Sequence, residues 1–188
     1  MNNFNILNGF FTDRLLLRKT IDSDALPLYD KIFNNYDYYK YYFPFYIDSF
    51  KTYQYIINTA NKQNLGDNVI SLTICLKDTF EPIGLITIHT IDYQNKSCGL
   101  GYIISKSYSN YGYTTEAVNR VLDYILNYLN IHRVEAQIIS SNISSIEVAK
   151  KCHFKYESTR TESCFLDGQF YNQDVYVILN SNNTNYQN

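Results

Sequence analysis

The stretch Asn110-Tyr111-Gly112-Tyr113-Thr114-Thr115-Glu116-Ala117 decides the fold prediction. It lies between an apolar run at residues 100–104 and an amphipathic pattern at residues 115–129, as the turn between a strand and a helix does. A helix start presents unpaired main-chain N–H groups and the positive end of the helix dipole, and both favour phosphate. Gly112 lets the main chain approach a bulky anion without a Cβ in the way. One glycine before a helix is usually only a turn, so these residues alone leave both interpretations open.

The composition is that of one globular domain without a strong charge. The chain has 188 residues, of which 45% are apolar and 18% charged, and its formal net charge is −2. We expect a single domain over residues 1–188, with a core at about 10–180 and a polar tail at about 181–188. No basic cluster indicates nucleic acid or a membrane surface, and no apolar run approaches the ~20 residues of a membrane helix. No charged-then-apolar signal segment is seen at the N-terminus, so the cytoplasm is the expected location.

Cysteines and histidines show no metal pattern. The four cysteines contain no C-x-x-C pair and the three histidines form no ligand motif, so no metal is expected. Buried, reduced thiols are the favoured interpretation for Cys75, Cys98, Cys152 and Cys164. The aromatic run at residues 36–45 indicates either a binding wall or simple packing in a tyrosine-rich chain, and the sequence leaves both open.

Hydrophobic periodicity and turn residues predict a single α/β domain. Strands are expected at residues 10–18, 69–76, 82–90, 98–104, 133–139, 154–161 and 173–179. Helices are expected at about 22–34, 48–63, 115–129 and 144–151, the last one opened by a capping box of Ser144 and Glu147. Short turns are expected at residues 66–68, 78–79, 93–95 and 167–168, and connections this short favour antiparallel pairing.

The order of these elements, with the residues that mark them, resembles the GNAT superfamily of acyl-coenzyme A-dependent N-acetyltransferases. The chain looks most similar to the ribosomal-protein N-terminal acetyltransferase branch, over residues 12–179. Four pieces carry the resemblance: Thr12-Asp13-Arg14-Leu15-Leu16-Leu17-Arg18 with Asp24-Ala25 behind it, Ile83-Gly84-Leu85-Ile86, Gly101-Tyr102-Ile103-Ile104 followed by Gly112-Tyr113-Thr114-Thr115-Glu116-Ala117, and His132-Arg133-Val134-Glu135-Ala136 followed by Asn142-Ile143-Ser144-Ser145-Ile146 and Phe154.

The resemblance implies a mixed, mostly antiparallel sheet of about seven strands flanked by about four helices, with a splay between the fourth and fifth strands. The implied co-substrate is acetyl-coenzyme A, whose pantetheine arm would lie in the splay. The turn before the long helix would wrap the pyrophosphate with main-chain N–H groups. A main-chain N–H near residues 100–103 would stabilise the oxyanion of the thioester. The cofactor-binding residues that the resemblance implies are Leu100, Tyr102, Ile103, Ile104, Asn110, Tyr111, Gly112, Tyr113, Thr114, Thr115 and Asn142.

The implied reaction is direct attack of a primary amine on the acetyl thioester while both substrates are bound. The amine would belong to a protein N-terminus, a polyamine or an amino sugar, and the lack of surplus carboxylates argues against a strongly cationic polyamine. Ser145 is expected near the coenzyme A sulfur as the acid that protonates the thiolate, with Asn142 beside it. Both residue types are also favoured helix caps, so a purely capping role stays open, and a tyrosine is the alternative acid.

The general base is not evident. Many members of the family read Glu-Ile-Gly-Tyr where this chain has Gly99-Leu100-Gly101-Tyr102, so the carboxylate is missing. Deprotonation would then go through water or through His89, Asp92 or Glu135, and His89 is expected at the end of a strand beside the cleft. A strand-end histidine is also a common surface residue. The catalytic candidates are Ser145, Asn142 and His89.

Two further departures from the family motif affect the cofactor loop and the last turn. Asn110 stands where the loop Gln/Arg-x-x-Gly-x-Gly/Ala has its first glycine, and Ser107 stands at its first position. Asparagine tolerates a left-handed conformation, so the turn is expected to survive. His153 replaces the glycine that usually precedes the phenylalanine. These changes motivate an alternative function, a degenerate member that binds coenzyme A, or nothing, as a regulatory module. A monomer and a homodimer both stay open.

Overall fold

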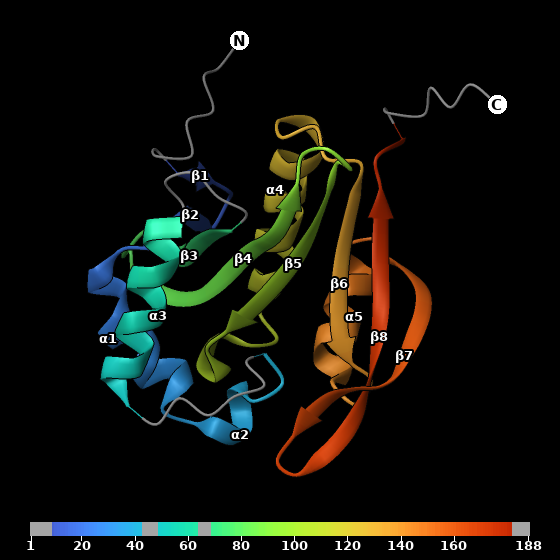
Figure 1. Ribbon diagram of the computed structural model, residues 1–188. Coiled ribbons are helices and arrows are strands. Elements are labelled where there is room, and N and C mark those ends of the chain that lie inside the picture. The colour runs from blue at the N-terminus through green and yellow to red at the C-terminus, as the bar shows by residue number, and fades with distance from the viewer. Residues whose placement is uncertain (1–8, 43–48, 64–68, 182–188) are drawn as a thin grey trace, which may run out of the picture.

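One sheet of eight strands organises the chain. The computed structural model describes residues 9–42, 49–63 and 69–181, and in them the strand order is β1-β2-β3-β4-β5-β6-β8-β7 (Figure 1). The strands are β1 (Phe10–Phe11), β2 (Leu15–Lys19), β3 (Ile70–Leu76), β4 (Pro82–Asp92), β5 (Ser97–Ile104), β6 (Arg133–Ile139), β7 (Lys155–Leu166) and β8 (Gln169–Leu179). All neighbours pair antiparallel except β5 and β6, which pair parallel. The predicted mixed, mostly antiparallel sheet is therefore confirmed.

The sheet has one strand more than expected because the first predicted strand is folded into a hairpin. The Leu15 N–H donates to Thr12 Oγ1 (2.8 Å) and the Thr12 N–H donates to the Leu15 carbonyl (2.9 Å). This tight turn lets Phe10 pair with Leu17. The single strand predicted at residues 10–18 was therefore wrong, since alternation of apolar residues does not reveal a turn closed by one threonine side chain.

Helices cover both faces of the sheet (Figure 1). The helical elements are the 3-10 helix η2 (Asp22–Asp24), α1 (Ala25–Leu28), the π-helix η3 (Tyr29–Phe33), α2 (Tyr36–Tyr39), α3 (Phe50–Gln63), the 3-10 helix η4 (Lys106–Tyr108), α4 (Tyr113–Asn127) and α5 (Ile143–Lys151). One continuous helix at 22–34 was predicted. The structure instead has a 3-10 helix, a short α-helix and a π-helix in succession. The π-helical hydrogen bond is seen at the end of this segment, where the Asn34 N–H donates to the Tyr29 carbonyl five residues earlier (2.7 Å). The predicted turn at 66–68, the cap at Asp48 and most of the predicted tail lie outside the described residues.

Two hydrophobic cores lie on opposite faces of the sheet. On one face, α4 buries Val118, Val121 and Ile125 completely. On the other face, η3 and α3 pack Phe33 and Tyr53 against the sheet, with ring centroids 4.4 Å apart. Strand β5 contributes alternate residues to the two cores, as the pleat of a strand requires: Leu100, Tyr102 and Ile104 to the α4 and α5 face, and Ile103 to the α1 and α3 face.

The sheet opens between β5 and β6. The two strands pair only where Ser97, Cys98 and Gly99 face residues 133–135, and beyond Gly99 they diverge (Figure 1). These are the fourth and fifth strands of the prediction, because the first predicted strand became two. The expected splay is thus confirmed, and it leaves five residues of β5, 100–104, without a partner on the β6 side.

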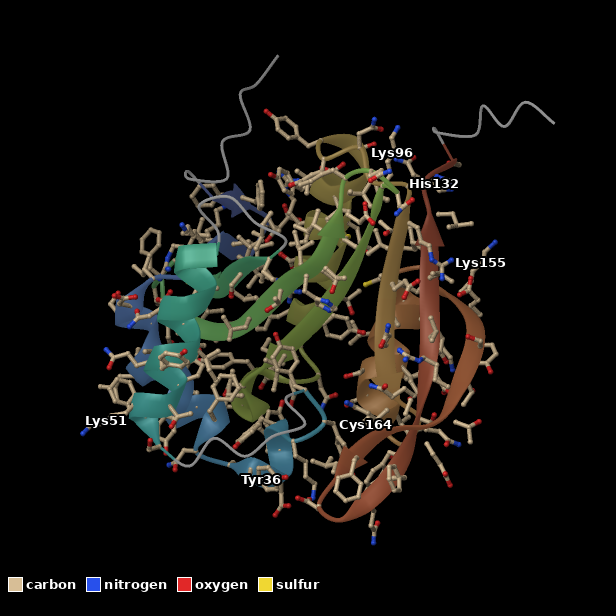
Figure 2. All side chains as sticks on the ribbon, in the orientation of Figure 1. Tyr36, Lys51, Lys96, His132, Lys155 and Cys164 are labelled. Carbon is tan, nitrogen blue, oxygen red and sulfur yellow. The ribbon has the colours of Figure 1, made fainter. Side chains whose placement is uncertain are left out.

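The far end of the opening is bridged from the other half of the molecule. The Tyr36 hydroxyl in α2 donates to Asp167 Oδ1 at the tip of the β7–β8 hairpin (2.5 Å), and Lys40 Nζ lies 3.4 Å from Asp167 Oδ2. We call these three residues the tip bridge. Figure 2 shows Tyr36 and Cys164 at this same end of the molecule. The aromatic run therefore contains a short helix, α2, which the sequence did not predict.

The four cysteines are buried and free, as the sequence predicted. Burial raises the pKa of the Cys75 thiol to about 11 and that of the Cys98 thiol to about 12. Thiols with pKa values this high carry almost no thiolate at neutral pH, and they act here as small apolar core residues.

Candidate active site

A cleft of about 1080 Å³ occupies the opening between β5 and β6. It is lined from both faces of the sheet, because β5 contributes all residues from Leu100 to Ile104. The α4 and α5 side adds the loop before α4 and the first turns of α5. The other side adds Tyr38, Tyr41 and Tyr42, with Thr87 and His89 of β4. A cleft that passes through a sheet in this way admits two substrates from opposite faces.

The loop before α4 holds two left-handed positions that are separated by one residue. Asn110 has φ +68° and Gly112 has φ +82°, and both line the cleft with Thr114 and Thr115. The expectation that asparagine would preserve the turn in place of a glycine is confirmed. His153, which replaces the other expected glycine, also adopts a left-handed conformation (φ +65°). The two substitutions therefore change residue types but leave the local backbone conformation that a glycine would adopt.

The N-terminus of α4 presents unpaired donors toward the cleft. Gly112 is the N-cap and no side chain caps the helix. The first helical hydrogen bond is from the Glu116 N–H to the Gly112 carbonyl (3.0 Å). In the described chain, the N–H groups of Tyr113, Thr114 and Thr115 are left without a partner, as the first turn of a helix requires. Unpaired N–H groups of this kind, together with the helix dipole, favour a phosphate group.

Arg14 anchors this loop from the first hairpin of the sheet. Its Nη1 donates to the Tyr111 carbonyl (3.0 Å), its Nε donates to Glu116 Oε2 (2.7 Å), and its guanidinium lies 4.5 Å from the centroid of the Tyr113 ring. Tyr111 and Tyr113, whose main-chain N–H groups were predicted to bind the cofactor, are not among the residues that line the cleft, although their neighbours Gly112 and Thr114 are. Sequence reasoning missed Arg14, although it stands in the opening motif that carried the resemblance.

The unpaired side of β5 directs main-chain groups into the opening. The Ser105 N–H donates toward β4, to the Ile83 carbonyl (2.7 Å). Main-chain direction alternates along a strand, so Leu100, Tyr102 and Ile104 point their N–H and C=O groups toward the opening. The Ile104 carbonyl there accepts the Tyr38 hydroxyl (2.7 Å). The N–H groups of Leu100 and Tyr102 are placed as donors beside any carbonyl that enters the cleft.

The first turn of α5 brings Asn142 and Ser145 to the cleft. Asn142 is the N-cap, and its Oδ1 accepts the Ser145 N–H (3.2 Å) and the Ser144 hydroxyl (2.9 Å). The predicted capping box of Ser144 and Glu147 is wrong, since Asn142 takes the cap and Glu147 pairs with Lys150 (3.0 Å). The Ser145 hydroxyl takes no part in the cap and has no hydrogen-bond partner in the described chain.

Tyr102 ties this turn to β5 across the opening. Its hydroxyl donates to the Ser145 carbonyl (2.8 Å), and burial raises its pKa. The hydroxyls of Tyr38 and Tyr42 are also hydrogen-bonded. Tyr38 donates to the Ile104 carbonyl, and Tyr42 Oη lies 3.0 Å from Thr87 Oγ1. Among the serines that line the α5 side of the cleft, Ser141 and Ser145 offer hydroxyls that no other group in the described chain holds, and of these two Ser145 lies in the first turn of α5.

The three candidate bases lie in different surroundings. Only His89 lines the cleft. Asp92 accepts the N–H (2.8 Å) and the side-chain amide (2.7 Å) of Asn95, which lowers its pKa. Glu135 accepts Arg133 Nε (2.7 Å). The structure therefore keeps His89 as a candidate and assigns the two carboxylates to local contacts.

The cleft walls carry little free charge. Two carboxylates line it, and both are paired: Asp37 with Lys40 and Glu147 with Lys150, each at 3.0 Å. Lys151 lines the cleft without an ion-pair partner in the described chain, a feature that sequence reasoning missed. No three His, Cys, Asp or Glu side chains in that part of the chain gather as metal ligands. None of its helices is long and apolar enough to span a membrane.

The chain belongs to the acetyltransferase (GNAT) domain family, whose model matches residues 14–155. It is 27% identical over 168 residues to YoaA, an uncharacterized N-acetyltransferase of Bacillus subtilis (strain 168), covering 89% of this chain and 94% of that one. The fold matches spermidine N-acetyltransferase from Vibrio cholerae in complex with CoA and spermine, with a TM-score of 0.80, 23% identity and 90% and 98% of the two chains covered. It also matches ribosomal L7/L12 alpha-N-protein acetyltransferase in complex with coenzyme A, with a TM-score of 0.82, 18% identity and coverage of 89% and 95%.

These comparisons identify the class of enzyme. The chain is an acetyl-CoA-dependent N-acetyltransferase of the GNAT family, as the resemblance in the sequence predicted. The family and its named relatives support this prediction over the alternative of a module without turnover.

The left-handed conformation at Gly112 makes a sharp prediction about coenzyme A. We expect Gly112→Val to raise the Kd for acetyl-CoA about tenfold or more, because a β-branched residue at φ +82° costs about 1–2 kcal/mol and forces the loop to change shape. Isothermal titration with acetyl-CoA measures the effect. The matched control is Asn110→Gly, which removes a side chain at a left-handed position and should keep or tighten binding. An unchanged Kd in a folded Gly112→Val protein would contradict the assignment of this loop to the phosphates.

Proposed function

We propose that this enzyme moves an acetyl group from acetyl-CoA directly to a primary amine while both substrates occupy the cleft. The observation that carries the proposal is the opening between β5 and β6, which runs from the uncapped N-terminus of α4 to the tyrosines of the opposite face. The pyrophosphate would bind the N–H groups of residues 113–115, with Lys151 available to a further phosphate. The pantetheine arm would lie along residues 100–104 of β5.

The chemistry divides between the two faces of the sheet. The N–H groups of Leu100 and Tyr102 would hold the thioester oxygen as negative charge develops on it. The amine would approach from the opposite face, beside Tyr42. Its attack forms the C–N bond, and collapse of the tetrahedral intermediate breaks the C–S bond. Overall the ammonium loses two protons, of which one ends on the coenzyme A sulfur and one reaches solvent.

We assign the acid to Ser145 and a positioning role to Asn142. Ser145 lines the cleft and its hydroxyl has no partner in the described chain, so its proton is available to the leaving thiolate. Asn142 holds the turn that carries Ser145, and its side-chain oxygen is already used there. Asn142 therefore acts through the geometry of α5, and its amide NH₂ is left for the pantetheine arm.

The acceptor that fits best has one amine and no further positive charge. A polycation requires free carboxylates, and both carboxylates that line the cleft in the described residues are held by lysines. Tyrosines line the acceptor side instead, and the Tyr42 ring lies 3.4 Å from the position of a Cβ built on Gly101. A protein N-terminus or a small amine with a flat neutral group is thus preferred over spermidine, although spermidine is the substrate that names the relative from Vibrio cholerae.

Two measurements test this function. The first is isothermal titration with acetyl-CoA, in which saturable one-to-one binding is expected. The second is release of free coenzyme A, followed with a thiol reagent, in the presence of spermidine, tyramine or tetrapeptides that begin with Ser, Ala or Met. Turnover is expected with an amine that carries no further positive charge and should be slow with spermidine. Binding without turnover on any amine would favour the regulatory-module alternative.

The remaining predictions concern the cell and the assembly. We propose a single-domain enzyme of the cytoplasm that acts as a monomer or a homodimer, with neither nucleic acid nor membrane as a partner. Its formal net charge of −2 and the spread of its lysines and arginines support the last point. Light scattering during size-exclusion chromatography distinguishes the monomer from the dimer.

A further inference from the structure

The imidazole of His89 occupies a space that exists only because residue 99 is glycine. His89 on β4 and Gly99 on β5 are directly opposite each other in the sheet. A Cβ built on Gly99 would lie 2.1 Å from His89 Cε1, 2.6 Å from Nδ1 and 2.7 Å from Nε2. No real side chain tolerates such contacts with a ring, so the two residues form one fitted unit.

This unit lies on the acceptor face of the opening. Residues that pair across β4 and β5 point to the same face, so His89 shares a face with Gly99, and Thr87 shares it with Gly101. Tyr42 covers the neighbouring row, since its hydroxyl contacts Thr87 and its ring lies over Gly101. His89 also stands at the point where β5 and β6 part, because Gly99 is the last residue of β5 that pairs with β6.

A strained residue fixes the orientation of the ring. Thr90 has φ +51°, a left-handed conformation that is a genuine outlier for a β-branched residue. The strain coincides with a register shift in the β4–β5 pairing after His89, and it brings Thr90 Oγ1 to 3.1 Å from His89 Nδ1. His89 has no other hydrogen-bond partner in the described chain, so Nε2 is not held by any protein group there.

The surroundings keep the ring neutral. Burial lowers the pKa of His89 below its usual value of 6.5. Glu135 on β6 pairs with Gly99 and therefore lies on the same face of the sheet as His89, and its carboxylate is neutralised by Arg133. Asp92, further along β4, is held by Asn95, and burial raises the pKa of Tyr42 to about 12. Strand β3 ends its pairing with β4 at Ile88 and brings no charge beside the ring.

We propose that His89 is the general base of the acetyl transfer, seated in the gap at Gly99 and oriented by Thr90. Thr90 accepts the Nδ1 proton, so the Nε2 lone pair is free to take a proton from the acceptor ammonium. The neutral amine then attacks the thioester, and His89 passes the proton to solvent after the amide forms. Thr90 is a positioning residue and His89 a catalytic one. This inference rests on the proposed function, since it names the base of that reaction.

The first test compares two histidine variants. His89→Gln should lower kcat about tenfold or more for the best amine of the panel and leave the Kd for acetyl-CoA unchanged. The wild-type rate should fall at acid pH with a midpoint below 6.5, where the ring becomes protonated, and the variant should lose this limb. His153→Gln, at an exposed turn, is the matched control and should behave as wild type. An acid limb that persists in His89→Gln would overturn the proposal.

The second test reads the ring directly and does not depend on turnover. The chain has three histidines, so ¹⁵N imidazole spectra assign His89 by its loss in His89→Gln. The Nδ1–H tautomer is expected at neutral pH, and Thr90→Val should alter the tautomer balance while the fold is kept. Gly99→Ala should displace the ring and lower kcat without changing acetyl-CoA affinity. A dominant Nε2–H tautomer, or full activity in Gly99→Ala, would contradict the assignment.

The failure of this inference is distinguishable from failure of the proposed function. If the wild-type protein binds acetyl-CoA but acetylates no amine, the proposed function fails. If the wild type turns over and His89→Gln matches it at every pH, only the assignment of the base fails.

Discussion

Replacing Ser145 by alanine is expected to lower kcat about 100-fold, within the range that a single general acid contributes. Ser145 lines the cleft, and the described chain offers its hydroxyl no partner, so its loss removes a proton donor without breaking a structural contact. The turn itself is held by main-chain groups of Ser145, which the substitution keeps: its N–H to Asn142 and its carbonyl to Tyr102. The Kd for acetyl-CoA should therefore change little.

The measurement is a pair of steady-state and binding curves for Ser145→Ala and for a neighbouring control. Ser144→Ala removes a hydroxyl that donates to the Asn142 cap and faces the same helix start. It should cost some helix stability and little rate. Equal rates for the two variants would contradict the role of Ser145 as the acid. The proton on the coenzyme A sulfur would then come from solvent.

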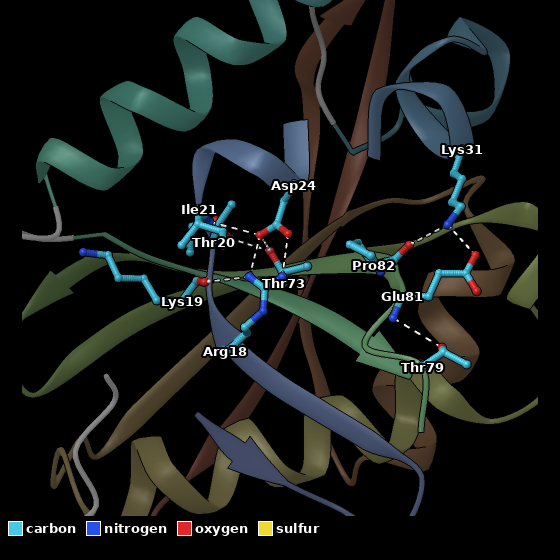
Figure 3. Close-up of polar contacts among 11 residues, drawn as sticks. Arg18, Lys19, Thr20, Ile21, Asp24, Lys31, Thr73, Thr79, Glu81 and Pro82 are labelled. Carbon is cyan, nitrogen blue, oxygen red and sulfur yellow. Dashed lines mark hydrogen bonds and ion pairs between the residues drawn. The ribbon is translucent and has the colours of Figure 1, made fainter. Parts of the chain in front are cut away.

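Replacing Asp24 by alanine is expected to destabilise the fold by about 3 kcal/mol, which lowers the Tm by about 10 °C for a chain of this size. Figure 3 shows the reason, because Asp24 gathers four hydrogen bonds. It accepts both terminal nitrogens of Arg18 (2.7 and 2.6 Å), the Thr73 hydroxyl (2.8 Å) and the Ile21 N–H (3.0 Å). Its side chain is 1% exposed, so the partners left behind lose an acceptor that water cannot fully replace.

Thermal unfolding followed by circular dichroism measures the effect. Asp30→Ala is the matched control, since Asp30 lies exposed in the π-helix η3 that follows α1. The expected loss of unfolding free energy is at the lower end of the range for broken buried ion pairs, because the Arg18 side chain is 24% exposed and regains some hydration. A change in Tm no larger than that of the control would show that Arg18 and Thr73 find other partners.

The sequence predicted the elements that follow simple periodicity. The strand at residues 133–139 was predicted with the bounds that the structure shows, and the apolar spacing of Val118, Val121 and Ile125 predicted the buried face of α4. Such predictions succeed because burial of one face imposes its period on the residues. The order of these elements and the family motif then determined the splay, which no single element reveals.

The errors arose where one side chain overrides a pattern. Thr12 closes a turn inside an apolar alternation, and Asn142 caps a helix that Ser144 was expected to open. Asp24 is drawn toward Arg18, and its segment begins as a 3-10 helix in place of the predicted regular helix. In each case a hydrogen bond to a specific partner decides the local geometry. Periodicity contains no information about that bond.

The expected cofactor residues follow from the order of the elements, whereas the proposed base depends on strand register. Main-chain donors follow from a strand, a turn and a helix in the right order, so residues 110–115 could be named without side-chain detail. The contact between His89 and Gly99 depends on the register of β4 and β5, which places the two residues opposite each other although they are ten positions apart. Gly99 has no side chain, so the imidazole fits over it. Sequence reasoning recorded the missing carboxylate at Gly99 as a loss, and the structure shows the gap filled by an imidazole.

The tip bridge has a consequence for the order in which the molecule forms. Tyr36 and Asp167 are separated by 131 positions along the chain, and Lys40 and Asp167 by 127. Contacts of such long sequence separation carry a large loop-closure entropy and are made after the local hairpins and helices. Two other links across the opening are much shorter in sequence: the parallel pairing begins with Ser97 opposite Arg133, and the Tyr102 hydroxyl reaches the Ser145 carbonyl over 43 positions. We therefore expect the tip bridge to form last, after the hairpins and the shorter links, so that the gap between β5 and β6 acquires its final width in the last step.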